Sequence, residues 1–177
     1  GKAYNDYGNG FYCTEHIELA KEWACSENVD GYANKYEIDS SDLTVLNLSS
    51  SEFMILNWLA ILMLHREARL STPLARRGKD YLIRNFLPDF EHYDVIVGYR
   101  ADDSYFSFAR SFVNNEISLK QLGYAMKPGK LGEQFVLKSQ KAFNTIRFID
   151  YEVADNTIYY AKRKVRDDEA RTAYNKE

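Results

Sequence analysis

The chain has 177 residues, 45% of them hydrophobic and 28% charged, and these are ordinary values for one globular domain with a sizeable core. Because 23 Lys and Arg stand against 26 Asp and Glu, the formal net charge is −3, and no overall positive field exists to hold nucleic acid. The most apolar stretch, residues 53–64, is too short and too interrupted to span a bilayer.

The N-terminal stretch combines a glycine turn with aromatic residues. After a polar loop, Gly8-Asn9-Gly10 precedes Phe11-Tyr12, which predicts a sharp bend and then a strand. Residues 15–26 are predicted to form a helix capped by Thr14, with Ile17, Ala20, Trp23 and Ala24 on one stripe. This shape suits a flat, partly aromatic ligand lying against exposed backbone. The same residues are more often a common turn and a core tryptophan, and the glycine pattern alone favours that interpretation.

Two strands and two helices are predicted next. The strands cover residues 32–38 and 44–48, and a helix with a serine cap runs from Glu52 to about Arg69. This helix is apolar on most sides and should be buried, with His65 at its polar end as a surface residue. Thr72 caps the following helix, which runs to about Leu87. Its basic residues indicate a solvated face or a contact with an acidic partner: Arg76, Arg77, Lys79 and Arg84.

The second half of the chain contains the clearest strand. Residues 94–99 predict a central strand, and charged residues follow it directly, with Asp103 or Ser104 as the cap of a helix through Phe112. The remaining predicted elements are a helix over 118–124, a strand over 131–139, a short turn or helix over 142–144, a strand over 145–153, and an exposed helix over 157–173 capped by Asp155. Strands, then helices, then strands again indicate an α+β domain that covers residues 1–177, with 155–177 as an exposed C-terminal helix.

Cys13 and Cys25 are the only cysteines, and two cysteines in a chain of this size do not make a disulfide framework. We interpret both as reduced thiols in a cytoplasmic protein. The three His and two Cys lie at no metal-ligand spacing, so no metal site is predicted.

Three segments together resemble the ADP-ribosyltransferase superfamily. Gly8-Asn9-Gly10-Phe11-Tyr12, followed by an aromatic residue on a helix, is similar to the second conserved segment of its poly(ADP-ribose) polymerase and diphtheria-toxin branch. The segment from Glu133 to Gln140 resembles the strand that carries the catalytic glutamate there. With Ala101-Asp102-Asp103 after the central strand, the stretch 7–153 resembles a bacterial family of small, poorly characterised ADP-ribosyltransferase-like proteins.

The resemblance implies a split β-sheet core with surrounding helices, and a cleft that binds NAD as substrate. Gly8 and Gly10 would bring backbone near the nicotinamide, whose ring Tyr12 and Trp23 would stack on from both sides. Thr14 would bond the ribose or simply cap the helix. Phe11 and Asp102 complete the implied NAD-binding set, and Glu133 and Gln134 are the implied catalytic residues.

Two departures from the family pattern matter. Adjacent strand residues face opposite ways, so only one of Glu133 and Gln134 can point into the cleft. The family pattern favours Gln134, whereas the chemistry favours Glu133, since a carboxylate stabilises the positive charge that develops as nicotinamide leaves. The superfamily's first strand, with a His or Arg and a Gly that grip NAD, has no counterpart in this sequence, so either it lies in a longer chain or the domain is degenerate.

We therefore expect an ADP-ribosyltransferase that passes ADP-ribose to a macromolecular acceptor, with protein favoured over nucleic acid. The resemblance also allows a bacterial toxin or phage-defence effector, held by an antitoxin or another partner protein, and implies no membrane partner. The alternative is a non-catalytic module that binds NAD, ADP-ribose or a partner on the same scaffold. A weaker third hypothesis is a nucleic-acid contact through the basic helix face.

Overall fold

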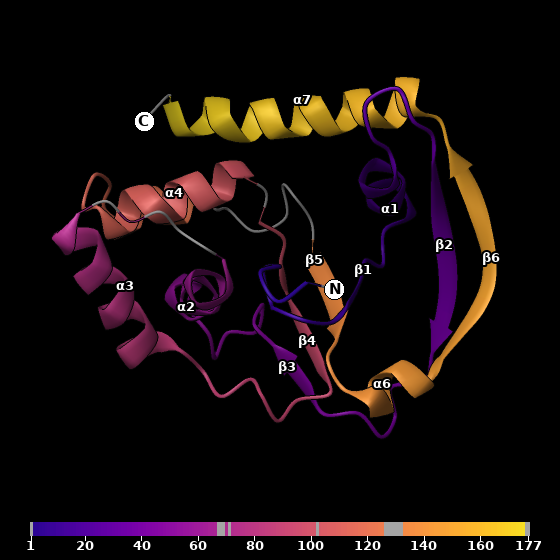
Figure 1. Ribbon diagram of the computed structural model, residues 1–177, viewed down its shortest axis with the longest axis horizontal. Coiled ribbons are helices and arrows are strands. Elements are labelled where there is room, and N and C mark those ends of the chain that lie inside the picture. The colour runs from indigo at the N-terminus through magenta and orange to yellow at the C-terminus, as the bar shows by residue number, and fades with distance from the viewer. Residues whose placement is uncertain (1, 67–69, 71, 102, 126–132, 176–177) are drawn as a thin grey trace.

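The computed structural model describes residues 2–66, 70, 72–101, 103–125 and 133–175, and it has an α+β fold (Figure 1). The elements in chain order are β1 (Phe11–Cys13), α1 (Ile17–Ala24), β2 (Gly31–Ile38), β3 (Val45–Asn47), α2 (Ile55–His65), α3 (Pro73–Phe86), β4 (Val95–Tyr99), α4 (Asp103–Val113), α5 (Leu119–Ala125), β5 (Glu133–Leu137), α6 (Gln140–Asn144), β6 (Ile146–Ala154) and α7 (Asn156–Asn175). The α+β class predicted from the sequence is confirmed.

The larger sheet has four strands in the order β1-β5-β4-β3. β4 pairs with β5 in antiparallel register and with β3 in parallel register, so it is a central strand as predicted. Val95 and Ile96 are fully buried on opposite faces of β4, because the sheet is covered on both sides. β1 pairs with β5 in antiparallel register and forms one edge of the sheet.

A separate sheet consists of β2 and β6, which run antiparallel along one side of the molecule (Figure 1). β6 has one extra residue, Ile149, because the adjacent residues Lys35 and Tyr36 of β2 oppose Asp150 and Phe148. At one end of the ribbon Gly31 lies so close to Ala24 of α1 that a side chain would not fit. The small sheet therefore packs against α1.

The main core lies between the larger sheet and the helices α2, α3 and α4. α2 is the buried helix that the sequence predicts, and its residues 58–63 are all at most 1% exposed. α3 begins as predicted, because the Thr72 hydroxyl accepts the backbone N–H of Ala75 at 3.1 Å and Pro73 occupies the first turn. A smaller cluster around Val95, Leu137 and Ala142 covers the other face of the sheet.

Two predicted helix starts are wrong. α1 begins at Ile17, and Thr14 instead accepts the backbone N–H of His16 at 3.3 Å, so it does not cap the helix. α2 begins at Ile55 without a serine cap, since the Asn57 side chain accepts the Met54 N–H at 2.8 Å. The preceding serines lie in turns, and the Ser49 hydroxyl is bonded to β5 instead.

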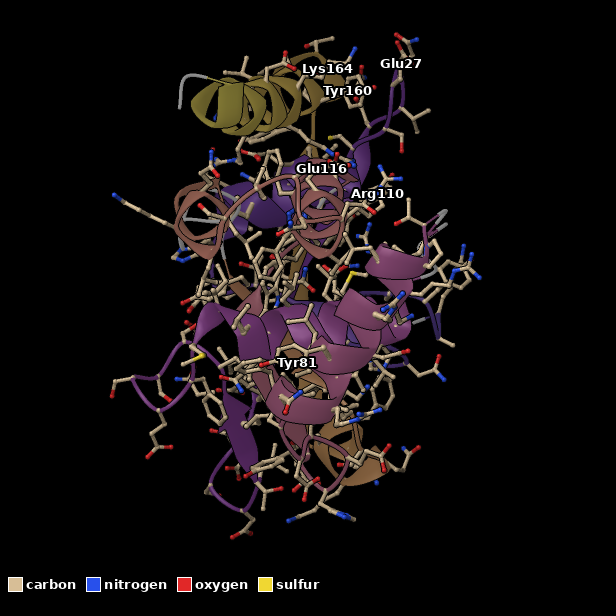
Figure 2. The ribbon with its side chains drawn as sticks, turned by 90° about the vertical axis from the view of Figure 1, so that its left-hand side faces the viewer. Glu27, Tyr81, Arg110, Glu116, Tyr160 and Lys164 are labelled. Atoms are coloured by element: carbon tan, nitrogen blue, oxygen red, sulfur yellow. The ribbon has the colours of Figure 1, made fainter. Side chains whose placement is uncertain are left out.

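The stripe predicted for α1 is also wrong. The helix buries Leu19 and Glu22, while Ile17 is exposed. The reason is α7, whose Arg166 holds the Glu22 carboxylate through two hydrogen bonds of 2.9 Å. α7 contacts α1, α4 and α5, and Figure 1 shows it lying across α1 and α4. On α7, the Lys164 ammonium lies 4.8 Å from the centre of the neighbouring Tyr160 ring (Figure 2).

Candidate functional site

The two segments that carry the family resemblance are hydrogen-bonded neighbours in the larger sheet. Phe11 lies opposite Leu137, Tyr12 opposite Val136, and Cys13 opposite Phe135. Gly10 lies against β5 so closely that a Cβ atom would come within 2.7 Å of Val136. The glycine turn and the late strand, which are far apart in the sequence, therefore meet in one part of the molecule.

Glu133 and Gln134 point to opposite faces of β5. Gln134 is buried, and its Nε2 donates to Asp6 Oδ2 at 3.1 Å, while its Oε1 is buried without a hydrogen-bond partner. Glu133 is half-buried, and its Oε1 accepts a hydrogen bond from the Ser49 hydroxyl. Glu133 is thus the carboxylate on the more open face, and Gln134 belongs to a buried polar network.

A small hollow opens beside Glu133. Its lining residues come from the loop just before α1 and from β4 and β5: Glu15, His16, Val97, Glu133, Gln134 and Phe135. Its volume is about 20 Å³, which is room for one water molecule. In this conformation the hollow does not hold a nicotinamide ring.

Trp23 on α1 contacts Arg100 at the end of β4. The centre of the Arg100 guanidinium lies 5.1 Å from the centre of the indole, in the range of a cation–π interaction. The indole Nε1 is buried without a hydrogen-bond partner. The aromatic residue predicted as a platform is therefore already covered on one side by an arginine.

Tyr12 is tied to the glycine turn rather than to Trp23. Its hydroxyl donates to the Gly8 carbonyl at 2.7 Å and accepts the backbone N–H of Tyr7 at 3.0 Å, and burial raises the pKa of this hydroxyl above its ordinary value. The ring packs against the main core, on the face of the sheet that Val136 shares. No ring contact joins Tyr12 and Trp23, both of which the structure describes, so the predicted sandwich is not brought together.

The space that Gly8 leaves is filled by a side chain. Gly8 has φ +72°, a left-handed conformation, and a Cβ atom there would lie 2.5 Å from the His65 ring. His65 is half-buried, its Nδ1 lies 3.0 Å from the Ile61 carbonyl oxygen, and burial lowers the pKa of the imidazole. The prediction of a surface histidine is therefore wrong, because the ring packs between the turn and Phe90.

Phe11 and Thr14 do not line the hollow, and Asp102 is not among the residues that the structure describes. The Phe11 ring contacts Tyr36 and Phe143, with ring centres 5.4 and 5.8 Å away. Thr14 bonds the His16 N–H, as described above, and Asp102 lies outside the described residues. Of the basic residues on α3, Arg76, Arg77 and Arg84 are exposed and Lys79 is half-buried.

The polar hub at Asp6 was not predicted from the sequence. Its Oδ1 accepts from Arg66 Nε at 2.8 Å, and its Oδ2 accepts from the Ala101 backbone N–H at 2.9 Å and from Gln134. Arg66 Nη2 also donates to the Ala101 carbonyl at 2.9 Å. The hub joins the N-terminal loop, the end of α2, the end of β4, and β5. A charged residue in a polar loop carries no sequence signal for such burial.

The cysteines are separate thiols. Cys25 is buried and its Sγ lies 3.3 Å from the Ala154 carbonyl oxygen, while burial raises the pKa of Cys13 to about 11. Within the described residues, no group of three or more His, Cys, Asp and Glu side chains is arranged to hold a metal ion. In the same part of the chain, no helix has both the length and the apolar character needed to cross a membrane.

The fold and this hollow define a small α+β domain with one half-buried carboxylate at the end of its sheet. Residues 1–148 match the family described as "Protein of unknown function (DUF3990)". The chain therefore belongs to the DUF3990 family, whose matched region ends within β6 and leaves α7 outside. No curated protein and no solved structure matches the chain significantly.

Proposed function

We propose that this protein is an NAD-dependent ADP-ribosyltransferase with Glu133 as its catalytic carboxylate. The observation that carries the proposal is the pairing of β1 with β5, which joins the two segments that resemble the superfamily and leaves Glu133 on the more open face. Gln134 is committed to Asp6, so it serves the framework rather than the reaction. The acceptor is a macromolecule, with protein favoured over nucleic acid.

The chemistry of the proposed reaction needs one well-placed negative charge. The bond between the nicotinamide nitrogen and ribose C1′ breaks, and the pyridinium nitrogen keeps the electron pair, so neutral nicotinamide leaves. Positive charge develops on the ribose, where the Glu133 carboxylate stabilises it. The acceptor then forms its bond to C1′ and releases a proton to water. The hydroxyl of Ser49 orients the carboxylate.

Substrate entry on this proposal requires movement of the residues around the hollow, since the space holds about one water molecule. The wall most able to move is the loop just before α1, whose Glu15 and His16 are exposed. The two free thiols favour the cytoplasm as the site of action, because disulfides are rare there. NAD is available in that compartment.

The second candidate is a module that binds NAD or ADP-ribose without cleaving it. The small hollow and the arginine already stacked on Trp23 favour this alternative. The two functions differ in one measurable product, free nicotinamide.

The test is release of nicotinamide from NAD labelled in the nicotinamide ring. For the transferase we expect slow release by the unaltered chain, and a loss of about 100-fold in Glu133→Gln, because one preorganised electrostatic contact is worth that much. The matched control is Glu91→Gln, which changes an exposed carboxylate elsewhere. Calorimetry with NAD accompanies each assay. Binding without release supports the binding module. If NAD is neither bound nor cleaved, both functions are rejected.

A further inference from the structure

We propose that β6 is a self-pairing edge through which two copies of this chain form a dimer with one continuous four-stranded sheet. The small sheet has only two strands, and β6 lies at the outside of the molecule (Figure 1). Among the described residues β2 is its only strand neighbour, so no other strand occupies the outer edge of β6, where the Tyr151 N–H donates to its own neighbour Asp150 at 2.7 Å. Sheets of two strands are marginal, and a third strand stabilises them.

The face beside this edge is aromatic and exposed. Phe148, Tyr151 and Val153 of β6 are 53%, 52% and 58% exposed, and they share one face with Tyr32 and Tyr36 of β2. Ring contacts cross the ribbon, with centres 5.4 Å apart for Tyr32 and Tyr151 and 5.7 Å apart for Tyr36 and Phe148. Contiguous exposed apolar side chains of this kind mark interaction surfaces.

The extra residue in β6 makes the strand complementary to itself. Without it, Phe148 and Tyr151 would face opposite ways, since successive side chains alternate. Because Ile149 is inserted, both lie on the aromatic face, while Arg147 and Glu152 both lie on the other face. The pattern is thus symmetric about a point between Ile149 and Asp150.

This symmetry selects one antiparallel register for two copies. A twofold axis between Ile149 and Asp150 places Phe148 opposite Tyr151 of the second copy, and Arg147 opposite Glu152. The same axis places Ile146 opposite Val153. Each contact occurs twice, as an isologous interface requires. Aromatic and opposite-charge cross-strand pairs are the stabilising ones in antiparallel sheets, and this register supplies both.

The charges are available for this contact. Arg147 and Glu37 form an ion pair across the small sheet with both side chains mostly exposed, and Glu152 pairs with Lys21 at 2.7 Å while remaining 62% exposed. A strand-to-strand contact is small beside a standard interface of about 1,600 Å², so we expect a dissociation constant on the order of tens of micromolar.

The experiment is sedimentation velocity across a concentration series of the full chain, with charge reversals on the edge. Arg147→Glu and Glu152→Arg should each weaken dimerisation about tenfold, because each reversal spoils two symmetric pairs. An equimolar mixture of the two variants should dimerise again, since each of the two cross-strand pairs in the mixed dimer once more joins an acidic and a basic side chain. Lys35→Glu on the inner strand is the matched control and should leave dimerisation unchanged.

Mixing separates the interface from folding damage. Each reversal also opposes a neighbour in its own chain, Glu37 or Lys21, and mixing does not repair that fault. Recovery in the mixture therefore supports the paired edge. The proposal is overturned if the chain stays monomeric at all concentrations up to about ten times the expected dissociation constant. It is also overturned if neither charge reversal weakens dimerisation.

Discussion

Asp6, whose side chain is 5% exposed, forms an ion pair with Arg66, whose side chain is 21% exposed, and Nε and Nη2 of the guanidinium both lie 2.8 Å from Oδ1 of the carboxylate. The other carboxylate oxygen accepts the Ala101 N–H and the Gln134 amide. Four segments that are far apart in the chain therefore share one carboxylate, which fixes the end of β4 relative to β5.

Replacing Asp6 by Asn should destabilise the fold by roughly 3 kcal/mol, because Arg66 would lose its counter-charge in a largely buried place. The new amide would also bring donor hydrogens into a position surrounded by donors. Urea unfolding of Asp6→Asn measures the effect. The control is Glu37→Gln, which breaks an exposed pair with Arg147 and should cost less than about 1 kcal/mol. Equal losses in the two variants would contradict the role assigned to the hub.

Gly98 on β4 lies against the Tyr7 hydroxyl, and a Cβ atom there would approach Tyr7 Oη to 2.3 Å. The Tyr7 hydroxyl donates to the Tyr99 carbonyl at 2.7 Å, so the ring cannot move away without breaking that bond. Gly98→Ala should therefore destabilise the protein by about 1–3 kcal/mol. Gly123→Ala is the matched control: no atom lies within 4 Å of its added methyl group, and alanine is preferred to glycine in α5. A higher thermal unfolding midpoint for Gly98→Ala than for Gly123→Ala would contradict this packing.

The elements with a strong local signal were predictable. A few neighbouring residues are enough to predict the apolar strand β4 and the start of α3 at Thr72-Pro73. The start of α1 was not predictable, because Thr14 has a competing local bond to His16 and because α7 buries Glu22 on the side expected to be polar. The sequence pattern around Glu22 carries no information about its partner Arg166, which lies 144 positions away in the chain.

In the candidate site, too, local sequence predicted some features, while contacts between distant residues decided the others. Alternation along a strand predicted that Glu133 and Gln134 face opposite ways, and they do. Which of them is buried depends on Asp6, a residue of the N-terminal loop whose burial has no local cause. The glycines suggested an approach to a ligand, whereas Gly8 and Gly10 lie against His65 and Val136, contacts that exist only in the folded chain.

Asp94 gives a prediction for acid stability. The Ser139 hydroxyl at 2.6 Å and the Thr44 N–H at 3.0 Å stabilise its charged form and lower its pKa to about 2. A carboxyl group whose pKa is lower in the folded state stabilises the fold above its unfolded pKa of 3.8, and this contribution is lost as the pH falls toward 2. The urea midpoint of the unaltered protein should therefore fall more steeply between about pH 4 and pH 2 than that of Asp94→Asn.

The direct check on Asp94 is carboxyl titration by NMR. In Ser139→Ala the pKa of Asp94 should rise toward its ordinary value, because the strongest of its hydrogen bonds is removed. Asp42→Asn, a change at a nearby exposed carboxylate, should leave the pKa of Asp94 and the steepness of the acid transition as they are. An Asp94 pKa near its ordinary 3.8 in the unaltered protein would show that these bonds do not form in solution.

The contact between Glu22 and Arg166 predicts an asymmetry between two substitutions. Glu22 is 1% exposed at its side chain, whereas Arg166 is 33% exposed. Arg166→Gln leaves a carboxylate buried without its guanidinium and should cost roughly 3 kcal/mol. Glu22→Gln leaves a guanidinium that can turn to water, and should cost about 1 kcal/mol. Lys162→Gln, which breaks an exposed pair with Glu18, should cost less than either.

Hydrogen exchange shows where that stability is lost. α7 contacts α1 through this ion pair, so Arg166→Gln should speed amide exchange in both helices, while exchange in β4 changes only as far as global stability does. The variant thereby separates docking of α7 from the core beneath it. If Glu22→Gln proves as costly as Arg166→Gln, or if exchange quickens only in α7, then α1 keeps its place without the C-terminal helix and the ion pair is not what buries Glu22.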